Sequence, residues 1–213
     1  MRHAAAWLVV LAALAAGEAL DRAAVRVGAQ VITESAVRRH LRMEAFVQNR
    51  APDAGAEARR KAAERLIDQA LVRRELELNR YPPPPAAEVE ANLEQIRKGR
   101  NEDAGGFARS LERYGFSEEE LRNEVSYEIA LLRFVDFRFS PGVQVSEEEA
   151  QQAYEKEVVP EAQRRNAAPP ALDEERAGIV KLLTYRKTTA ALEQWLAQAR
   201  QQVKIRYFEE AFR

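Results

Sequence analysis

The chain has 213 residues, which is enough for one domain or two small ones with a buried core. Its 33 lysine and arginine residues nearly balance its 34 aspartate and glutamate residues, so a nucleic-acid partner, which would require a clearly basic face, is not expected. The absence of cysteine excludes disulfides, thiol catalysis and a lipidated-cysteine anchor.

The first 17 residues have the pattern of a secretory signal peptide. A basic start at Arg2 is followed by apolar residues 4–16 and by small residues suited to cleavage. We expect cleavage after Gly17 or Ala19, which leaves 20–213 as a single exported domain with no stable membrane insertion. An uncleaved anchor is the alternative, but thirteen apolar residues fall short of the roughly 20 that a membrane-spanning helix needs.

Residues 24–32 have the pattern of a small β-hairpin. Their β-branched valines surround Gly28, which can adopt positive φ in the turn. Thr33 then favours the N-cap position of a helix that runs to about Gln48.

Apolar residues recur three and four positions apart through 56–79 and predict a long helix there. The prolines of 82–85 end it, because proline cannot continue a helix. We interpret this run as a stiff connector to a helix over 86–97 rather than as a polyproline recognition motif. A shorter helix is predicted over 107–114, before a glycine.

Ser117 and Glu120 form a capping box, which predicts the start of another helix. That helix is apolar on two faces, with Leu121, Val125, Ile129 and Leu132 on one and Tyr127, Leu131 and Phe134 on the other. A helix of this kind is either buried centrally or presents a surface to a partner.

An aromatic-rich segment with interleaved arginines follows on this helix. Either its rings pack against other helices, or they line a cleft that holds extended apolar segments of unfolded proteins. Aromatic side chains suit the second role because they offer a large contact area with little sequence discrimination. The candidate client-binding residues are Tyr127, Leu131, Phe134, Phe137 and Phe139.

The C-terminal part begins with a second capping box at 146–149, which predicts a helix through Tyr154. We interpret residues 155–171, which contain two adjacent prolines near their end, as a linker. The last helix is predicted to begin near Asp173. Alternating apolar and charged residues at 203–207 predict a strand that can pair with the N-terminal hairpin.

Residues suited to catalysis or cofactor binding are few. His40 is the sole histidine after the predicted signal peptide, and we interpret it as a surface residue. The sequence has no histidine–cysteine cluster for a metal, no serine nucleophile motif and no phosphate-binding glycine loop. We therefore expect no catalytic residue, no cofactor and no metal.

Several segments, in their order and spacing, resemble the chaperone module of SurA-type periplasmic proteins, a family related to PpiD and PrsA. They are VGAQVITES at 27–35, RLIDQAL at 65–71, the Tyr-Gly step at 114–115, VSEEE at 145–149, and the helix and strand of 192–207. The resemblance implies a mainly α, SurA- or trigger-factor-like helical module with a small β-hairpin at about 24–32, joined by a strand at about 203–207. It also implies an ATP-independent chaperone that binds unfolded or nascent exported proteins, outer-membrane proteins among them.

Members of this family usually carry parvulin prolyl-isomerase domains at the point between Tyr154 and Leu172. The seventeen residues here cannot hold such a domain, and no histidine after His40 matches an isomerase site. The resemblance therefore implies client holding without prolyl isomerisation. A prolyl isomerase with an unrecognised site and an adaptor subunit that docks on one partner remain the alternatives, and the sequence does not indicate the oligomeric state.

Overall fold

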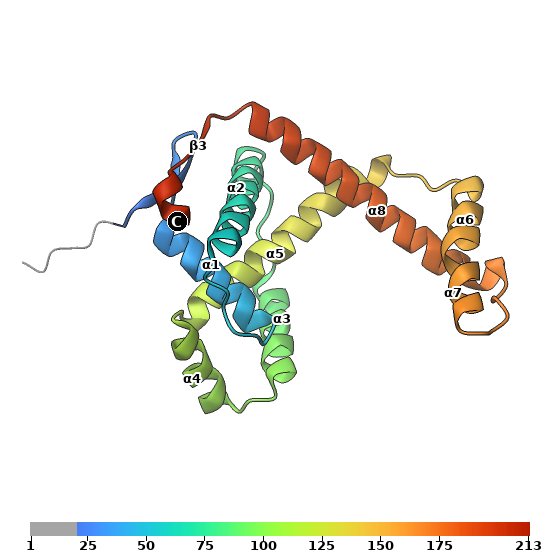
Figure 1. The fold of residues 1–213 in the computed structure, drawn as a ribbon, viewed down its shortest axis with the longest axis horizontal. Coiled ribbons are helices and arrows are strands. Elements are labelled where there is room, and N and C mark those ends of the chain that lie inside the picture. The colour runs from blue at the N-terminus through green and yellow to red at the C-terminus, as the bar shows by residue number, and fades with distance from the viewer. Residues whose placement is uncertain (1–20) are drawn as a thin grey trace, which may run out of the picture.

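The computed structural model describes residues 21–213, so the predicted signal peptide and its cleavage site lie outside the described residues. The described chain is mainly helical with a small three-stranded sheet, as the sequence predicts. Figure 1 labels the helices, which are α1 (Glu34–Val47), α2 (Ala56–Leu78), α3 (Ala86–Arg100), α4 (Ala104–Tyr114), α5 (Glu118–Phe139), α6 (Glu147–Ala153), α7 (Val159–Arg164) and α8 (Leu172–Gln201). Short 3₁₀ turns η1 and η3 occupy Ser140–Gly142 and Glu209–Phe212, and a π-helical turn, η2, occupies Tyr154–Val158.

The sheet joins the two ends of the described chain. It contains β1 (Ala23–Val27), β2 (Gln30–Thr33) and β3 (Ile205–Tyr207) in the order β2-β1-β3, and both pairs are antiparallel. Gly28 has a φ of 58° in the hairpin turn, and its N–H donates to the Lys204 carbonyl at 2.9 Å. The predicted pairing of the C-terminal strand with the hairpin is confirmed.

Local capping signals fix where several helices begin. The Thr33 hydroxyl accepts a hydrogen bond from the Ala36 N–H at the start of α1. Both capping boxes, at Ser117 and at Ser146, have their two reciprocal hydrogen bonds. The predicted starts of α1, α5 and α6 are therefore confirmed.

Two apolar cores lie side by side in the larger part of the molecule. The first packs the sheet against α1 and α2, around Val25 and Ile67. The second lies among α1, α3, α4 and α5 and centres on Phe46, which is completely buried. The Phe46 ring makes edge-to-face contacts with Phe107 at 5.7 Å and with Phe116 at 5.1 Å.

The C-terminal end of α8 is fastened to these cores by polar contacts. The Arg200 guanidinium donates to Glu64 Oε2 at 2.7 Å and to Asp68 Oδ1 at 2.8 Å, both on α2. The Tyr207 hydroxyl on β3 donates to Glu64 Oε1 at 2.7 Å. These contacts set the direction in which α8 leaves the sheet and crosses α5 (Figure 1).

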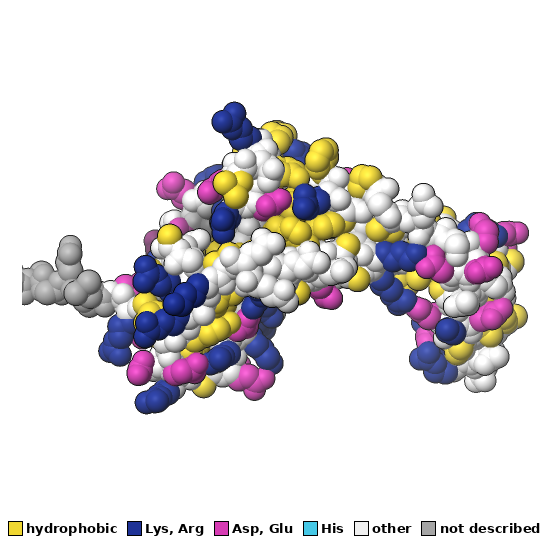
Figure 2. All heavy atoms as spheres, turned by 90° about the horizontal axis from the view of Figure 1, so that it is seen from above, with side chains coloured by type: hydrophobic (Ala, Val, Ile, Leu, Met, Phe, Trp, Pro, Cys, Tyr) yellow, Lys and Arg dark blue, Asp and Glu magenta, His cyan; other side chains and the backbone are white. Residues whose placement is uncertain are grey.

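Beyond that crossing, residues 143–188 form a projection that we call the arm, and we call the rest of the described chain the body. The arm consists of α6, η2, α7 and the first half of α8, and it projects from the body with a hollow beside it (Figures 1 and 2). Charged side chains of both signs cover its end in the space-filling view. Its core cluster consists of Ala150, Ala153 and Ile179, and Ala162 on α7 is buried as well.

The linker expected at 155–171 is much shorter than predicted, because the chain stays helical through Arg164. The π-helical turn at Tyr154–Val158 lies just before Pro160, and this proline explains the wider turn. A proline has no N–H and its ring clashes with the carbonyl four residues earlier, so a wider turn accommodates it better than a regular one. Only residues 165–171 are left without helix, and the Tyr154 hydroxyl closes that loop by donating to the Pro170 carbonyl at 2.7 Å.

Candidate functional site

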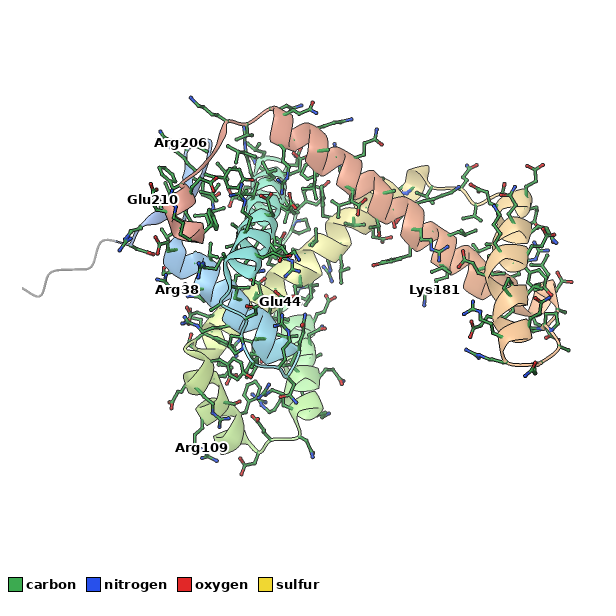
Figure 3. All side chains as sticks on the ribbon, in the orientation of Figure 1. Arg38, Glu44, Arg109, Lys181, Arg206 and Glu210 are labelled. Carbon is green, nitrogen blue, oxygen red and sulfur yellow. The ribbon has the colours of Figure 1, made fainter. Side chains whose placement is uncertain are left out.

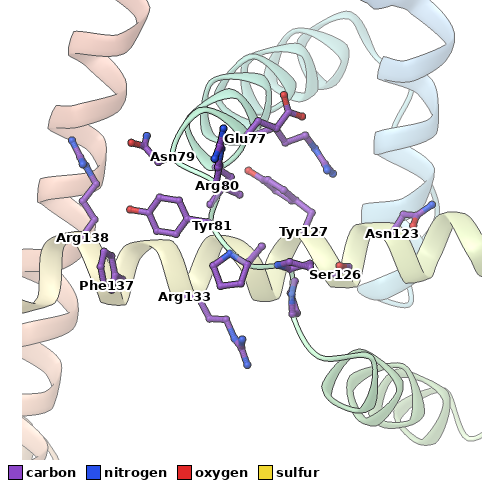
Figure 4. A pocket seen from close by; sticks show the side chains of 16 residues that line it. Glu77, Asn79, Arg80, Tyr81, Asn123, Ser126, Tyr127, Arg133, Phe137 and Arg138 are labelled. Atoms are coloured by element: carbon purple, nitrogen blue, oxygen red, sulfur yellow. The ribbon is translucent and has the colours of Figure 1, made fainter.

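A groove of about 1140 Å³ lies in the body between the end of α2, the proline-rich connection to α3 and one face of α5 (Figure 4). Its volume exceeds the roughly 300–1,000 Å³ of typical small-molecule sites. The residues that line it are Arg73, Leu76, Glu77, Asn79, Arg80, Tyr81, Pro82, Pro83, Pro84, Asn123, Ser126, Tyr127, Ala130, Arg133, Phe137 and Arg138. A space of this size between an aromatic helix face and a proline wall suits an extended peptide better than a small ligand.

One wall of the groove is a face of α5. Tyr127, Ala130 and Phe137 recur at helical spacing and therefore lie along one side of that helix. The Phe137 side chain is exposed, at 72% of its full area. This wall therefore presents an aromatic ring to solvent near the C-terminal end of α5.

The opposite wall follows from the way α2 ends. The Tyr81 N–H donates to the Leu76 carbonyl at 3.0 Å and the Arg80 N–H donates to the Glu77 carbonyl at 3.2 Å, which together close the helix. The three prolines at 82–84 then continue along the groove with fixed φ and without N–H donors. The wall is stiff and offers side-chain surface rather than hydrogen bonds.

The structure separates the five residues that the sequence proposes for client binding. Tyr127 and Phe137 line the groove, whereas Leu131, Phe134 and Phe139 do not. Phe134 is completely buried. Leu131 and Phe139 are half-buried outside the groove.

Phe134 belongs to the core where α5 crosses α8. Its ring makes edge-to-face contacts with Tyr81 at 5.6 Å, Phe139 at 5.7 Å and Trp195 at 5.4 Å. The prediction that Phe134 lines a client cleft is therefore wrong. Its ring packs against other parts of the protein, which is the alternative that the sequence left open. Because Tyr81 also contacts Phe137 at 5.7 Å, this buried cluster supports the exposed ring of the groove.

Sequence reasoning missed Tyr81 and the prolines at 82–84 as groove residues. It interpreted the run as a connector, which it also is, since it joins α2 to α3. The available signal was an aromatic residue followed by four prolines directly after a helix. That signal indicates a rigid apolar surface, but it cannot show that α5 lies opposite.

Charge in the groove is unbalanced, with four arginines and one carboxylate, Glu77, in the lining. Two of these arginines are paired with carboxylates that do not line the groove: Arg133 forms an ion pair with Glu88, and Arg138 lies 3.7 Å from Glu75. The other two, Arg73 and Arg80, have no carboxylate within 4.0 Å among residues 21–213.

Tyr127 carries a hydroxyl into the groove and lies under a guanidinium. Burial raises the pKa of Tyr127 well above its ordinary value of about 10, although the charge of Arg73 opposes the shift. The Arg73 guanidinium lies 4.3 Å from the centre of the Tyr127 ring, which is cation–π geometry. The hydroxyl therefore stays protonated and can donate a hydrogen bond to a ligand.

His40, interpreted from sequence as a surface residue, is instead half-buried between α1, α2 and α5. Its Nε2 atom is buried and has no hydrogen-bond partner within the described chain. Burial lowers the pKa of His40, and the neighbouring Arg65 acts in the same direction, while Glu124 and Glu44 oppose the shift. The imidazole is therefore kept neutral by packing.

Within residues 21–213, no group of three histidine, cysteine, aspartate or glutamate side chains is placed to hold a metal ion. The same residues include no helix that is both long and apolar enough to cross a membrane. No protein-family model matches the sequence, and no curated protein matches it either. The groove is therefore the feature of the described chain from which we infer a function.

Proposed function

We propose that the protein is an ATP-independent holding chaperone of the periplasm that binds unfolded or nascent exported proteins and does not isomerise prolines. The observation that carries this proposal is the open groove between α5 and the proline wall, with the exposed Phe137 at its edge. The resemblance to SurA-type chaperones supports it from the sequence side.

The groove offers little besides side chains. The backbone groups of α2 and α5 are bonded within their own helices, and the prolines at 82–84 have no N–H to donate. A client strand would therefore be held mainly through its own side chains. Rings such as Tyr81, Tyr127 and Phe137 provide this contact with little discrimination, which is what a promiscuous binder needs.

We expect the groove to bind any one client segment weakly. A client pays for the ordering of its chain when it binds, so we expect a dissociation constant on the order of micromolar. Release then requires no nucleotide, because folding or transfer of the client competes with such an affinity.

The part of the proposal that excludes prolyl isomerisation comes from the resemblance. SurA-type proteins carry a parvulin domain at the point that corresponds to residues 155–171 of this chain, where the arm has most of a π-helical turn, the helix α7 and a loop. The closing helix α8 and strand β3 are complete without an insertion.

Suppression of the aggregation of a chemically unfolded protein tests the proposal. Phe137→Ala should weaken suppression by about tenfold, because the ring contributes apolar area that a client would cover. Leu132→Ala is the matched control, since Leu132 is on the same helix, is 69% exposed and does not line the groove. Equal effects of the two substitutions would contradict the assignment of the groove.

Two parallel measurements test the alternatives. Acceleration of a proline-limited refolding reaction above background would show that the protein is a prolyl isomerase. Co-purification of one stoichiometric partner, without any suppression of aggregation, would show an adaptor subunit instead.

A further inference from the structure

The end of α2 has an unusual residue at its closing position. Among residues 21–213, the residues other than glycine with positive φ are Asn49, Asn101, Asn166 and Arg80, and all four stand at helix ends. Asparagine is the residue that tolerates this left-handed conformation best after glycine, whereas a long side chain does so at a cost. The helix closure does not require arginine, because its hydrogen bonds come from main-chain N–H groups.

What arginine adds at this position is a guanidinium in the groove. Arg80 lines the groove and has no carboxylate within 4.0 Å in the described chain. In Figure 4 its side chain stands between those of Tyr81 and Tyr127. The groove lining thus contains an exposed guanidinium without a carboxylate partner in the described chain, and Glu77 is the sole carboxylate among the described residues of that lining. Strain at a site residue of this kind points to a function.

We propose that the groove selects client segments in which aromatic residues adjoin aspartate or glutamate, and that Arg80 recognises the carboxylate. The inference rests on the proposed holding function and adds a sequence preference to it. Client rings contact Tyr127 and Phe137, while the adjacent carboxylate accepts hydrogen bonds from the Arg80 guanidinium, whose planar fork suits that group. Segments rich in lysine are disfavoured by repulsion from the groove arginines.

Fluorescence anisotropy with three labelled decapeptides tests this preference on the purified protein. The peptides share the same aromatic residues and differ only in the residues between them, which are aspartate, asparagine or lysine. We expect the aspartate peptide to bind about fivefold more tightly than the asparagine peptide, as for one exposed ion pair. The lysine peptide should bind most weakly, and the aspartate preference should decrease in high salt.

Variants separate charge recognition from packing. Arg80→Gln should abolish the aspartate preference, so that the aspartate and asparagine peptides bind equally, whereas Arg80→Lys should retain part of the preference. Arg109→Gln is the matched control, because Arg109 is exposed on α4, far from the groove (Figure 3). Loss of the preference in the control, or its persistence in Arg80→Gln, would overturn the role of Arg80.

The experiments distinguish the charge preference from the holding function. If the aspartate and asparagine peptides bind equally and Phe137→Ala weakens both, the charge preference is overturned and holding stands. If no peptide binds and aggregation is not suppressed, both are overturned.

Arg80→Gly adds a readout that a purely structural role would not give. Glycine adopts positive φ without strain, so the midpoint of thermal unfolding should stay the same or rise while the aspartate preference disappears. A lower midpoint with the preference intact would show that arginine is kept there for stability, and would overturn the inference.

Discussion

The body and the arm are both mainly helical, but they have very different cores. The body completely buries large side chains, among them Phe46, Phe134 and Ile67. In the part of the arm that the structure describes, the buried apolar residues are three alanines and Ile179. Because hydrophobic stabilisation follows the apolar area removed from water, most of the stability of the molecule resides in the body.

Polar contacts hold much of the arm together instead. Lys187 Nζ donates to the Gln144 carbonyl at 2.6 Å and lies 2.6 Å from Glu149 Oε1, and Arg186 forms an ion pair with Glu157. Exposed ion pairs of this kind contribute about 0–1 kcal/mol each. We therefore infer that the arm opens locally while the body, which contains the groove, stays folded.

Matched isoleucine substitutions give the largest expected difference between the two regions. Ile67→Ala should lower the free energy of unfolding of the body by about 2–5 kcal/mol, because it leaves a cavity beside fully packed neighbours. Ile179→Ala should leave the main unfolding transition nearly unchanged and reduce hydrogen-exchange protection in the arm. Denaturant unfolding and hydrogen exchange measure the two effects. Equal losses in the main transition would show that arm and body unfold as one unit.

The accuracy of prediction from the sequence also differs along the chain. It depends on whether an element is determined by neighbouring residues or by residues distant in the sequence. The capping boxes at Ser117 and Ser146 and the alternation at 203–207 act over a few residues, and the elements that they predict are present. The same holds for Thr33, whose hydroxyl caps the first helix. Such signals fixed the helix starts and the closing strand.

The groove depends on contacts that no local pattern encodes. Phe134 and Phe137 are the same residue type three positions apart on one helix, yet the first is completely buried and the second is 72% exposed. The difference arises because Trp195, distant in sequence, packs on Phe134 where α8 crosses α5. Sequence spacing could place both rings on α5, but it could not say which of them α8 would cover.

A smaller effect is expected from the hydrogen bond that closes the tip of the arm. Tyr154→Phe removes the hydroxyl that donates to the Pro170 carbonyl and should cost about 0.5–1.5 kcal/mol locally. Hydrogen exchange in α7 and the loop at 165–171 should become faster. Tyr185→Phe is the matched control, because Tyr185 is an arm residue that is 66% exposed. A change in peptide binding by Tyr154→Phe would show that arm and groove are coupled.

The smallest expected effect is a dependence on pH that is confined to the body. Burial lowers the pKa of His40 below its usual value of about 6.5, so the unfolded chain binds the proton more tightly than the folded chain does. The stability that His40 contributes is fully present above pH 6.5 and is lost as the pH falls through the folded pKa. In the arm, hydrogen bonds from Lys187 and Arg186 lower the pKa values of Glu149 and Glu157, so both stay ionised down to pH 5.5.

Unfolding of the protein and of His40→Gln at pH 7.5 and 5.5 measures this effect. The free energy of unfolding should fall between these two values in the protein itself, and by less in His40→Gln, because glutamine does not titrate. The charges that face His40 come from α1, α2 and α5, namely Glu44, Arg65 and Glu124, so the substitution leaves them in place. Hydrogen exchange in the arm should not follow the pH-dependent difference between the two proteins. If hydrogen exchange in the arm does follow this difference, protonation of His40 in the body changes the stability of the arm. The two regions would then be less independent than their separate cores imply.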